Sequence, residues 1–315
     1  MSENPLITLF SAPKPFTNPH IATIQRNAIR SWVELGGNVE VVLLGDEAGM
    51  AEAAAELGVR QIAEVKRNAL GTPLISSLFD LARGENHSPL LAYVNADILL
   101  LPDFLEAANE LLRQAGEFLM VGQRWDMEIT GLLDFSAGWS GRLREECRQH
   151  GALHKPMGSD YFVYPRACFE RIPDFAIGRA GWDNWMIYEA RRRGWKTVDA
   201  TADVMIIHQA HDYSHLPNGQ PHYRLPETGE NIRLAGGKRH IFLLSEANWA
   251  LSGGKLKRKR MTWQQFWREF ELFPAIHMRS TGLAELFHTV FHPRKAYDEF
   301  RKSKREKSSA EELVN

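Results

Sequence analysis

The sequence predicts an α/β protein with a mostly parallel sheet flanked by helices, a mixed second half and a helical C-terminal extension. Short apolar runs alternate with helix-period segments through residues 1–124, a pattern typical of a parallel sheet covered on both faces. The alternation loosens through residues 125–238. Residues 239–315 carry aromatic side chains at helical spacing among many Lys and Arg, which predicts the extension.

The first half is expected to contain five strands joined by helices. Apolar residues recur every three to four positions from Ile21 to Leu35, and Gly36 ends that pattern, as at a helix C-terminus. The other elements follow from similar patterns, with strands at 6–10, 39–44, 59–65, 90–94 and 118–122 and helices at 50–57, 74–83 and 102–114. Parallel sheets bind ligands at the carboxyl ends of their strands, so we expect the loops after these strands to line a site.

The second half is expected to be mixed rather than parallel. Helices are predicted at 140–150 and 184–193, with strands at 161–164 and 197–207. The segment Ser214–Gly237 is rich in Pro, Gly, Asn and His and is predicted to be a long loop that crosses or covers a site. Further helices are predicted at 239–251 and 263–273, and the tail from Lys302 is expected to fray.

Charge and composition exclude several classes of protein. The formal net charge is −1, but residues 255–307 hold fourteen Lys and Arg against six Asp and Glu, so the preceding body is acidic. An acidic body does not predict nucleic-acid binding. Neither a basic start with a long apolar run nor any stretch approaching the length of a membrane span is present, and the two cysteines do not suggest a disulfide framework. We therefore expect a cytoplasmic protein.

The sharpest local feature is the triplet Asn95-Ala96-Asp97 inside an otherwise apolar run. Burying an unpaired carboxylate costs several kcal/mol, so Asp97 needs a partner such as a metal ion or a helix N-terminus. The alternative is that Asp97 caps a turn through backbone amides, which is common for an Asp at a strand end.

This triplet on the fourth strand resembles the DxD motif of GT-A glycosyltransferases, nucleotide-diphospho-sugar transferases of the family-2-like kind, and the similarity extends over residues 6–215. The resemblance implies that Asp97 binds Mn²⁺ or Mg²⁺ at the donor diphosphate and that Asn95 contacts the ribose. Asn95 stands where the motif has an acid, which leaves the metal requirement open. It also implies a catalytic domain at 1–238, with a nucleotide-binding half at 1–124 and an acceptor and metal half at 125–238.

The resemblance extends to the loops after the first three strands. Ser11, Ala12, Pro13 and Asp46 match positions that border the nucleoside. The next loop would lie over the donor, where Arg67 could offset phosphate charge. Its other matching residues are Asn68, Gly71 and Thr72. The alternative for each Asp or Asn is a turn-forming role.

Asp183 lies between Trp182 and Trp185 just before a predicted helix, and this segment resembles the acidic region that supplies the general base of inverting GT-A enzymes. The two tryptophans could stack on a sugar. In a retaining enzyme Asp183 would instead orient a sugar. The alternative without catalysis is that Asp183 caps the helix N-terminus.

Three histidines and an acid occur between His208 and His215, directly after an apolar strand. The family resemblance makes His208 or His211 a metal ligand beside Asp97, and the alternative is a loop of polar histidines. In an extended strand His208 and His211 would face opposite sides, so both can serve one ion only if the chain turns between them. Arg124 and Asp160 could bind acceptor or donor-sugar hydroxyls, or pair with each other.

Residues 255–307 combine basic residues with aromatic side chains at helical spacing, so they could lie on an anionic membrane surface at the inner face of the membrane. The alternative is that these helices pack onto the rest of the chain. The leading hypothesis is a transferase that moves a sugar from a nucleotide-diphosphate sugar to a hydroxyl of a saccharide or lipid-linked acceptor. The alternatives are a metal-dependent hydrolase that uses the His208–His215 cluster and a non-catalytic nucleotide-sugar binding module.

Overall fold

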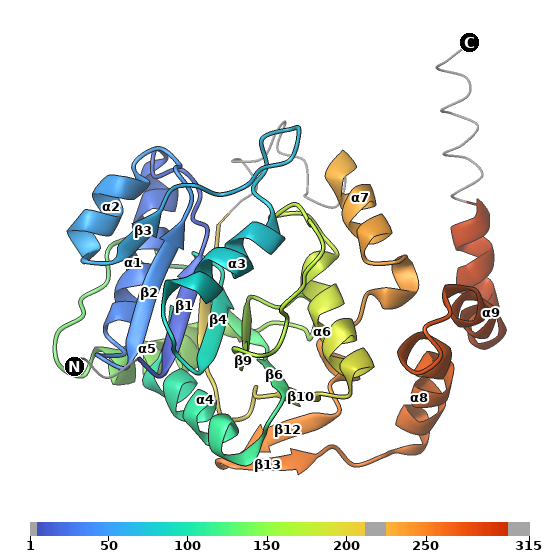
Figure 1. The fold of residues 1–315 in the computed structure, drawn as a ribbon. Coiled ribbons are helices and arrows are strands. Elements are labelled where there is room, and N and C mark those ends of the chain that lie inside the picture. Colours follow the sequence, from blue (N-terminus) through green and yellow to red (C-terminus); the bar gives the residue numbers. More distant parts are fainter. Residues whose placement is uncertain (1–4, 212–224, 302–315) are drawn as a thin grey trace. The chain divides into compact units, whose positions relative to one another are not determined.

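The computed structural model describes residues 5–211 and 225–301 (Figure 1). Two compact units are distinguished. The larger unit comprises Met1–Ala235 and Ile241–Lys259, and the C-terminal unit comprises Gly236–His240 and Arg260–Asn315. The residues discussed as candidate donor, acceptor and metal contacts all belong to the larger unit.

The main sheet of the larger unit has nine strands within the described residues, in the order β13-β12-β10-β6-β9-β4-β1-β2-β3. The pairs β1 with β2, β1 with β4 and β2 with β3 are parallel, whereas β9 runs antiparallel between β4 and β6. A mostly parallel sheet with a mixed second half is therefore confirmed. The strands are β1 (Ile7–Ser11), β2 (Val39–Leu44), β3 (Arg60–Ile62), β4 (Leu90–Val94), β6 (Phe118–Val121), β9 (Tyr161–Pro165), β10 (Lys196–Asp199), β12 (Trp249–Ser252) and β13 (Lys255–Arg258).

Helices connect the strands in the predicted alternation. Asn18 caps the first helix through its side-chain oxygen, with Pro19 at the first helical position, an arrangement that satisfies otherwise unpaired amides. The described helices of this unit are α1 (Pro19–Val33), α2 (Met50–Leu57), α3 (Ile75–Glu85), α4 (Pro102–Gln114), α5 (Trp139–His150), α6 (Trp182–Arg193) and α7 (Pro226–Leu234).

Strand β1 shows why the central strands read as continuous apolar runs. Leu9 belongs to the core shared with Trp32 of α1, while Phe10 packs edge-on against Phe79 of α3 with ring centroids 5.0 Å apart. Alternate side chains thus meet helices on opposite faces of the sheet, and both faces exclude water. Strands β1 and β4 end at Ser11 and Val94, and the residues that follow these ends belong to the candidate site.

A second, four-stranded sheet in the order β5-β11-β7-β8 was not predicted as a separate sheet. Its strands are β5 (Ile98–Leu100), β11 (Ile206–Gln209), β7 (Arg124–Met127) and β8 (Ala152–Leu153). The register places His208 beside Ile98 on one side and beside Asp126 on the other. Because Asp97 directly precedes β5, this pairing brings the triplet and the histidine segment together.

The single strand predicted at 197–207 is wrong, because two strands of different sheets occupy this range. Strand β10 ends at Asp199, whose side chain accepts hydrogen bonds from the backbone and hydroxyl of Thr201. The chain turns there and enters β11 at Ile206. A side-chain-closed turn between two apolar segments has little hydrophobic signature.

The helix predicted at 239–251 is also wrong. Short 3-10 turns at Lys238–His240 and Leu244–Glu246 precede the antiparallel pair of β12 and β13, which closes one end of the main sheet. Of the long loop predicted at Ser214–Gly237, residues 214–224 lie outside the described residues, and Pro226–Leu234 forms helix α7 rather than loop. The tail from Lys302 also lies outside them.

The C-terminal unit contains α8 (Trp263–Ile276) and α9 (Thr281–Phe291), which pack against each other. Thr262 and Gln265 form a reciprocal capping box at the start of α8. The helical part of the predicted extension is therefore confirmed for these residues. Within 5–211 and 225–301, none of the helices is long and apolar enough to cross a membrane.

Candidate functional site

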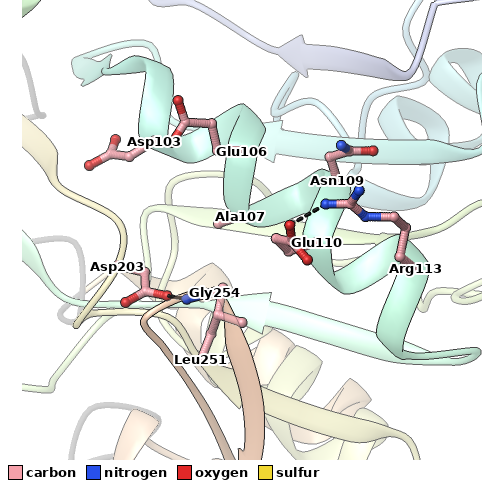
Figure 2. Close-up of a pocket in the computed structure, with 9 residues that line it drawn as sticks. All are labelled: Asp103, Glu106, Ala107, Asn109, Glu110, Arg113, Asp203, Leu251 and Gly254. Atoms are coloured by element: carbon pink, nitrogen blue, oxygen red, sulfur yellow. Dashed lines mark hydrogen bonds and ion pairs between the residues drawn. The ribbon is translucent and has the colours of Figure 1, made fainter.

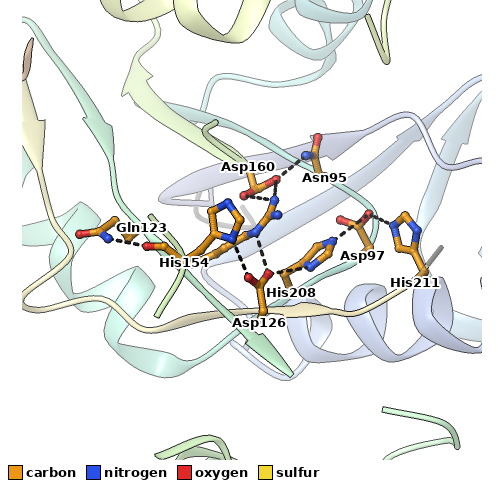
Figure 3. Close-up of polar contacts among 9 residues, drawn as sticks. Asn95, Asp97, Gln123, Asp126, His154, Asp160, His208 and His211 are labelled. Carbon is orange, nitrogen blue, oxygen red and sulfur yellow. Dashed lines mark hydrogen bonds and ion pairs between the residues drawn. The ribbon is translucent and has the colours of Figure 1, made fainter. Parts of the chain in front are cut away.

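Asp97, His208 and His211, here called the Asp97 cluster, offer ligand atoms that all lie within 4.8 Å of one another (Figure 3). His211 Nε2 lies 3.0 Å from Asp97 Oδ2, and His208 Nε2 lies 3.9 Å from the same oxygen. Strand β11 ends at Gln209, so the chain turns before His211 and both imidazoles can face Asp97. One acid and two imidazoles form a donor set that suits a divalent transition metal.

The second carboxylate oxygen of Asp97 marks the open side of this cluster. Asp97 Oδ1 is buried and has no hydrogen-bond partner among the described residues. A buried carboxylate oxygen without a partner is costly, and a cation ligated there would remove that cost. The residues present therefore fit a metal ion at this position.

The electrostatic surroundings of the cluster favour the ionised form of Asp97. Burial opposes ionisation of Asp97, but the hydrogen bond with His211 and the charges of His208 and Lys14 hold its pKa well below the usual range. Burial lowers the pKa of His208, and the charge of Asp97 acts in the opposite direction. Burial likewise lowers the pKa of Lys14, against the opposing charge of Asp97.

Asp126 contacts the imidazole rings of both His208 and His154. Its Oδ1 lies 3.0 Å from His208 Nδ1 and its Oδ2 lies 2.6 Å from His154 Nδ1 (Figure 3). A carboxylate on one imidazole nitrogen fixes the tautomer that leaves the other nitrogen for a metal. No sequence pattern indicated a role for His154, because its contact with Asp126 depends on the pairing of β7 with β8.

A partly buried network links Asp126 to the Asn95-Ala96-Asp97 triplet. Arg124 donates to Asp126 through Nε at 2.9 Å and to both oxygens of Asp160 through Nη1 at 3.0 Å. Asp160 also accepts from Asn95 Nδ2 at 2.9 Å. Of the two roles considered for Arg124 and Asp160, their mutual ion pair is therefore present.

Gln209 anchors the backbone of Asp97. Its amide nitrogen donates to the Asp97 carbonyl at 3.1 Å, and its side chain donates to the Ile24 carbonyl at 2.7 Å. Asn27 of α1 in turn donates to Gln209 Oε1 at 3.1 Å. The sequence pattern did not predict a role for these buried amide side chains. The signal for them was a polar residue inside an otherwise apolar segment.

The residues predicted to border the nucleoside lie at the carboxyl ends of β1 and β2. Ser11 is fully buried, and its Oγ has no hydrogen-bond partner within the described part of the chain. Ala12 is half-buried and Pro13 is buried. Asp46 is exposed and accepts from Arg67 Nη2 at 2.5 Å, while Glu47 accepts from the same nitrogen at 2.9 Å.

The loop after β3 is organised by Asn68. Its Oδ1 accepts from the backbone of Leu70 and Thr72, and its Nδ2 donates to Glu227 of α7 at 2.5 Å. Gly71 has a φ of 81°, which favours glycine, and its carbonyl accepts from Arg67 at 2.9 Å. The turn-forming role considered for Asn68 is therefore present in this structure.

Asp183 lies in the first turn of α6, and its Oδ1 accepts from the Gly181 amide at 3.3 Å. Burial raises its pKa to about 6, although backbone hydrogen bonds act in the opposite direction. The Asp160 carboxylate adds to the rise, which places Asp183 within electrostatic reach of the network around Asn95. A half-buried carboxyl with a pKa near neutrality can exchange protons at physiological pH.

The tryptophans beside Asp183 are packing residues. Trp182 is 5% exposed and Trp185 is 7% exposed. The Trp182 ring packs edge-on against Tyr93, with ring centroids 5.0 Å apart, and Trp185 packs against Phe175 at 5.2 Å. Both indole rings thus contact core aromatic side chains, and their stacking on a sugar stays a prediction.

Two surface pockets of the larger unit share no lining residue with the Asp97 cluster. One, of about 380 Å³, lies between α4 and the turn joining β12 to β13, where Asp203 accepts from the amides of Gly253 and Gly254 (Figure 2). The other, of about 550 Å³, includes Leu6 and Pro89 at the amino ends of β1 and β4. Ligands bind such sheets at the opposite, carboxyl ends, so the polar cluster is the better candidate.

No protein-family model and no curated protein matches the chain. Among solved structures, it is similar to a mannosyltransferase from Pyrobaculum calidifontis in complex with GDP-Man and Mn²⁺. The identity is 15% and the TM-score 0.42, over 68% of this chain and 59% of that chain.

The chain is also similar to glucosyl-3-phosphoglycerate synthase from Mycobacterium tuberculosis in complex with Mn²⁺, UDP and glucosyl-3-phosphoglycerate. This match has 16% identity and a TM-score of 0.42 over 68% of this chain and 75% of that chain. Another structure of the Mycobacterium tuberculosis synthase matches with 19% identity and a TM-score of 0.41 over 74% and 77%. At these identities and TM-scores, the matches assign no fold family, substrate, metal or reaction to the chain.

Proposed function

We propose that this chain is a metal-dependent glycosyltransferase that moves a sugar from a nucleotide-diphosphate sugar to an acceptor hydroxyl. The observation that carries the proposal is the convergence of Asp97, His208 and His211 at the carboxyl end of β4, with Asp97 Oδ1 buried and unpaired among the described residues. The site is thus built from the triplet that resembles the DxD motif.

The proposed ligands of Mn²⁺ or Mg²⁺ are the three residues of the Asp97 cluster. When bound, the cation would neutralise charge on the departing nucleotide diphosphate. Asp126 keeps His208 oriented toward Asp97. The buried Lys14 ammonium, within electrostatic reach of Asp97, supplies a second positive group for the diphosphate.

The proposed nucleoside contacts are the loops after β1, β2 and β3. Ser11 is the best supported of these, because its buried hydroxyl is unpaired among the described residues. Arg67 already pairs with Asp46 and Glu47, so phosphate binding by Arg67 would have to compete with these carboxylates. The remaining proposed donor contacts are Ala12, Pro13, Asp46, Asn68, Gly71, Thr72, Asn95 and Ala96.

Asp183 is the proposed general base that accepts the proton of the acceptor hydroxyl. Its raised pKa and its position within electrostatic reach of Asp160 support this role. Arg124 and Asp160, held together as an ion pair, are proposed to orient a sugar from the same side. The capping contact with Gly181 is compatible with this role, since it uses only one lone pair of the carboxylate.

Calorimetry with UDP, GDP and dTDP tests the proposal. In the presence of Mn²⁺, we expect at least one of these nucleotides to bind about tenfold or more tightly than in the presence of EDTA, because a cation held by the Asp97 cluster would neutralise charge on the diphosphate. The matching sugar nucleotide should then release its nucleotide slowly through hydrolysis, even without an acceptor.

The other outcomes distinguish the alternatives. Metal binding without any nucleotide binding would favour a hydrolase built on His208 and His211, whose remaining predicted members, Asp212 to His215, lie outside the described residues. Nucleotide-sugar binding that is unaffected by metal, with no turnover, would favour a binding module. Either result would contradict the proposed transferase.

A lipid-linked acceptor is proposed from the exposed aromatic face of α8. Trp263 is 73% exposed, and Phe266, Trp267 and Phe270 are each more than two-fifths exposed. Aromatic side chains favour the interface of a bilayer, and the excess of Lys and Arg in residues 255–307 suits anionic lipids. The segment Lys255–Arg258 is strand β13 rather than part of a helix, so only its charge contributes to this argument.

Flotation with vesicles of phosphatidylcholine and phosphatidylserine tests this membrane contact. The triple change Trp263→Ala, Phe266→Ala and Phe270→Ala should reduce the floating fraction roughly tenfold, because it removes the apolar anchor. The control replaces Leu70 and Leu132, each 71% exposed in the larger unit, by Ala. Equal flotation of the wild type and both variants would remove the membrane hypothesis.

A further inference from the structure

A second group of metal-ligating side chains lies in the C-terminal unit. Glu271 of α8 and His288 of α9, together with His292 just after α9, offer ligand atoms that all lie within 4.8 Å of one another. We call these residues the Glu271 cluster. The Glu271 cluster belongs to the C-terminal unit, whereas the Asp97 cluster belongs to the larger unit.

The helices place these side chains by simple spacing. His288 and His292 are four residues apart, so they lie on the same side of the α9 turn, and their ring centroids are 5.0 Å apart. Glu271 faces them from the partner helix. Its Oε1 lies 3.3 Å from His288 Nδ1, and its Oε2 lies 3.1 Å from His292 Nε2.

These distances suit a shared cation. Ligand atoms held about 2.0–2.2 Å from a tetrahedral Zn²⁺ lie roughly 3.3–3.5 Å from one another. The two observed separations are close to this range, although each runs to a different oxygen of the Glu271 carboxylate. One carboxylate oxygen and two imidazole nitrogens lie within 4.8 Å of one another, so side-chain rotations would bring them to a single ion. Two imidazoles and one carboxylate also form a common ligand set for Zn²⁺.

Two members of the cluster are buried, and burying an ionised carboxylate and an imidazole costs free energy unless other groups compensate. Glu271 is 6% exposed and His288 is 8% exposed, while His292 is 36% exposed in its side chain and leaves an entry path. Arg268 donates to Glu271 Oε2 at 2.8 Å and offsets part of this charge. His288 Nε2 has no hydrogen-bond partner among the described residues. His288 lies in the last turn of α9 and His292 directly follows it, and the helix dipole favours a cation at this end.

We propose that Glu271, His288 and His292 bind a divalent metal of the zinc type that links α8 to α9. The role is structural, because a metal bound to both helices stabilises their packing by its binding free energy. This inference is independent of the proposed transferase, since it involves none of the residues of the Asp97 cluster. The competing explanation is a metal-free network of one carboxylate, two histidines and Arg268.

Cobalt binding to the full-length Asp97→Asn protein tests the proposal, since this background weakens the first site. We expect visible d–d absorption with one Co²⁺ per chain and its displacement by Zn²⁺. Adding His292→Ala should weaken Co²⁺ binding at least about tenfold through loss of one ligand. Adding His277→Ala is the matched control, because His277 is exposed at the end of α8 and lies outside the cluster.

Thermal unfolding gives a second readout that needs no nucleotide and no activity. Zn²⁺ should raise the Tm of the Asp97→Asn protein by at least about 2 °C, and His292→Ala should abolish that rise. If His292→Ala binds Co²⁺ as the His277→Ala control does, or if Co²⁺ does not bind at all, the proposed site is wrong. The experiment measures metal binding in the Asp97→Asn protein, so a negative result for the Glu271 cluster does not affect the transferase proposal.

Discussion

Asp97→Asn should weaken Mn²⁺ binding by at least about 100-fold, on the order of 3 kcal/mol, and remove metal-dependent nucleotide binding. The substitution keeps an oxygen that can accept the hydrogen bond from His211 but removes the only carboxylate of the Asp97 cluster. Asn95 supplies no compensating charge, so Asp97 is the carboxylate of the cluster that can ligate the cation directly. Calorimetry with Mn²⁺ and with the nucleotide that binds the wild type measures the loss.

The control for this change is Asp134→Asn. Asp134 is an exposed carboxylate that pairs with Arg142 and takes no part in the cluster, so metal binding should be unaffected. Circular dichroism at the same pH verifies that both variants keep their helices. Full Mn²⁺-dependent nucleotide binding by the Asp97→Asn protein would show that the cation is held elsewhere and would refute the proposed site.

The alternation of strands and helices was readable because β1, β2 and β4 are buried on both faces. Such strands appear as short apolar runs, and Gly36 follows the end of helix α1, which lies between β1 and β2. The same signal failed at 197–207, where two strands follow each other with an Asp199 turn between them. Hydrophobic pattern identifies buried segments, but it does not state which sheet each segment joins.

The candidate site was readable only in part for a related reason. Asp97, His208 and His211 attracted notice as polar residues beside apolar strands. Asp126 and His154 belong to the same network, yet their role depends on the register of β7 with β8 and β11. Register between distant segments is a tertiary property, so no local pattern could have assigned His154 to the site.

For Trp182 and Trp185 the structure adds a packing role that the sequence pattern did not indicate. Both tryptophans lie close to Asp183 in the sequence, which suggested that they stack on a sugar. In the structure each ring packs against aromatic side chains of the larger unit. Their burial has a consequence for Asp183, because apolar rings around the start of α6 reduce solvation of its carboxylate. Desolvation is the largest influence on the raised pKa of Asp183.

Asp183→Asn should lower the rate of sugar transfer about 100- to 10,000-fold without lowering stability. The wild-type rate should rise with pH as Asp183 ionises with a pKa of about 6 and level off above it, and this limb should vanish in the variant. The folded-state pKa lies above the ordinary value of 3.8, so this residue favours the folded state most below pH 4 and loses that contribution as the pH rises through 6. Removing the charge should therefore leave the Tm at pH 7.5 equal or higher.

A loss of transfer rate without a loss of stability distinguishes a general base from a residue that only caps the helix. Asn can still accept the hydrogen bond from the Gly181 amide, so a residue that only caps α6 would show unchanged transfer. Asp174→Asn, a change of an exposed carboxylate in the preceding loop, is the matched control and should affect neither rate nor pH profile. A slow variant that keeps the wild-type pH limb would assign that ionisation to another group and leave Asp183 without the role of base.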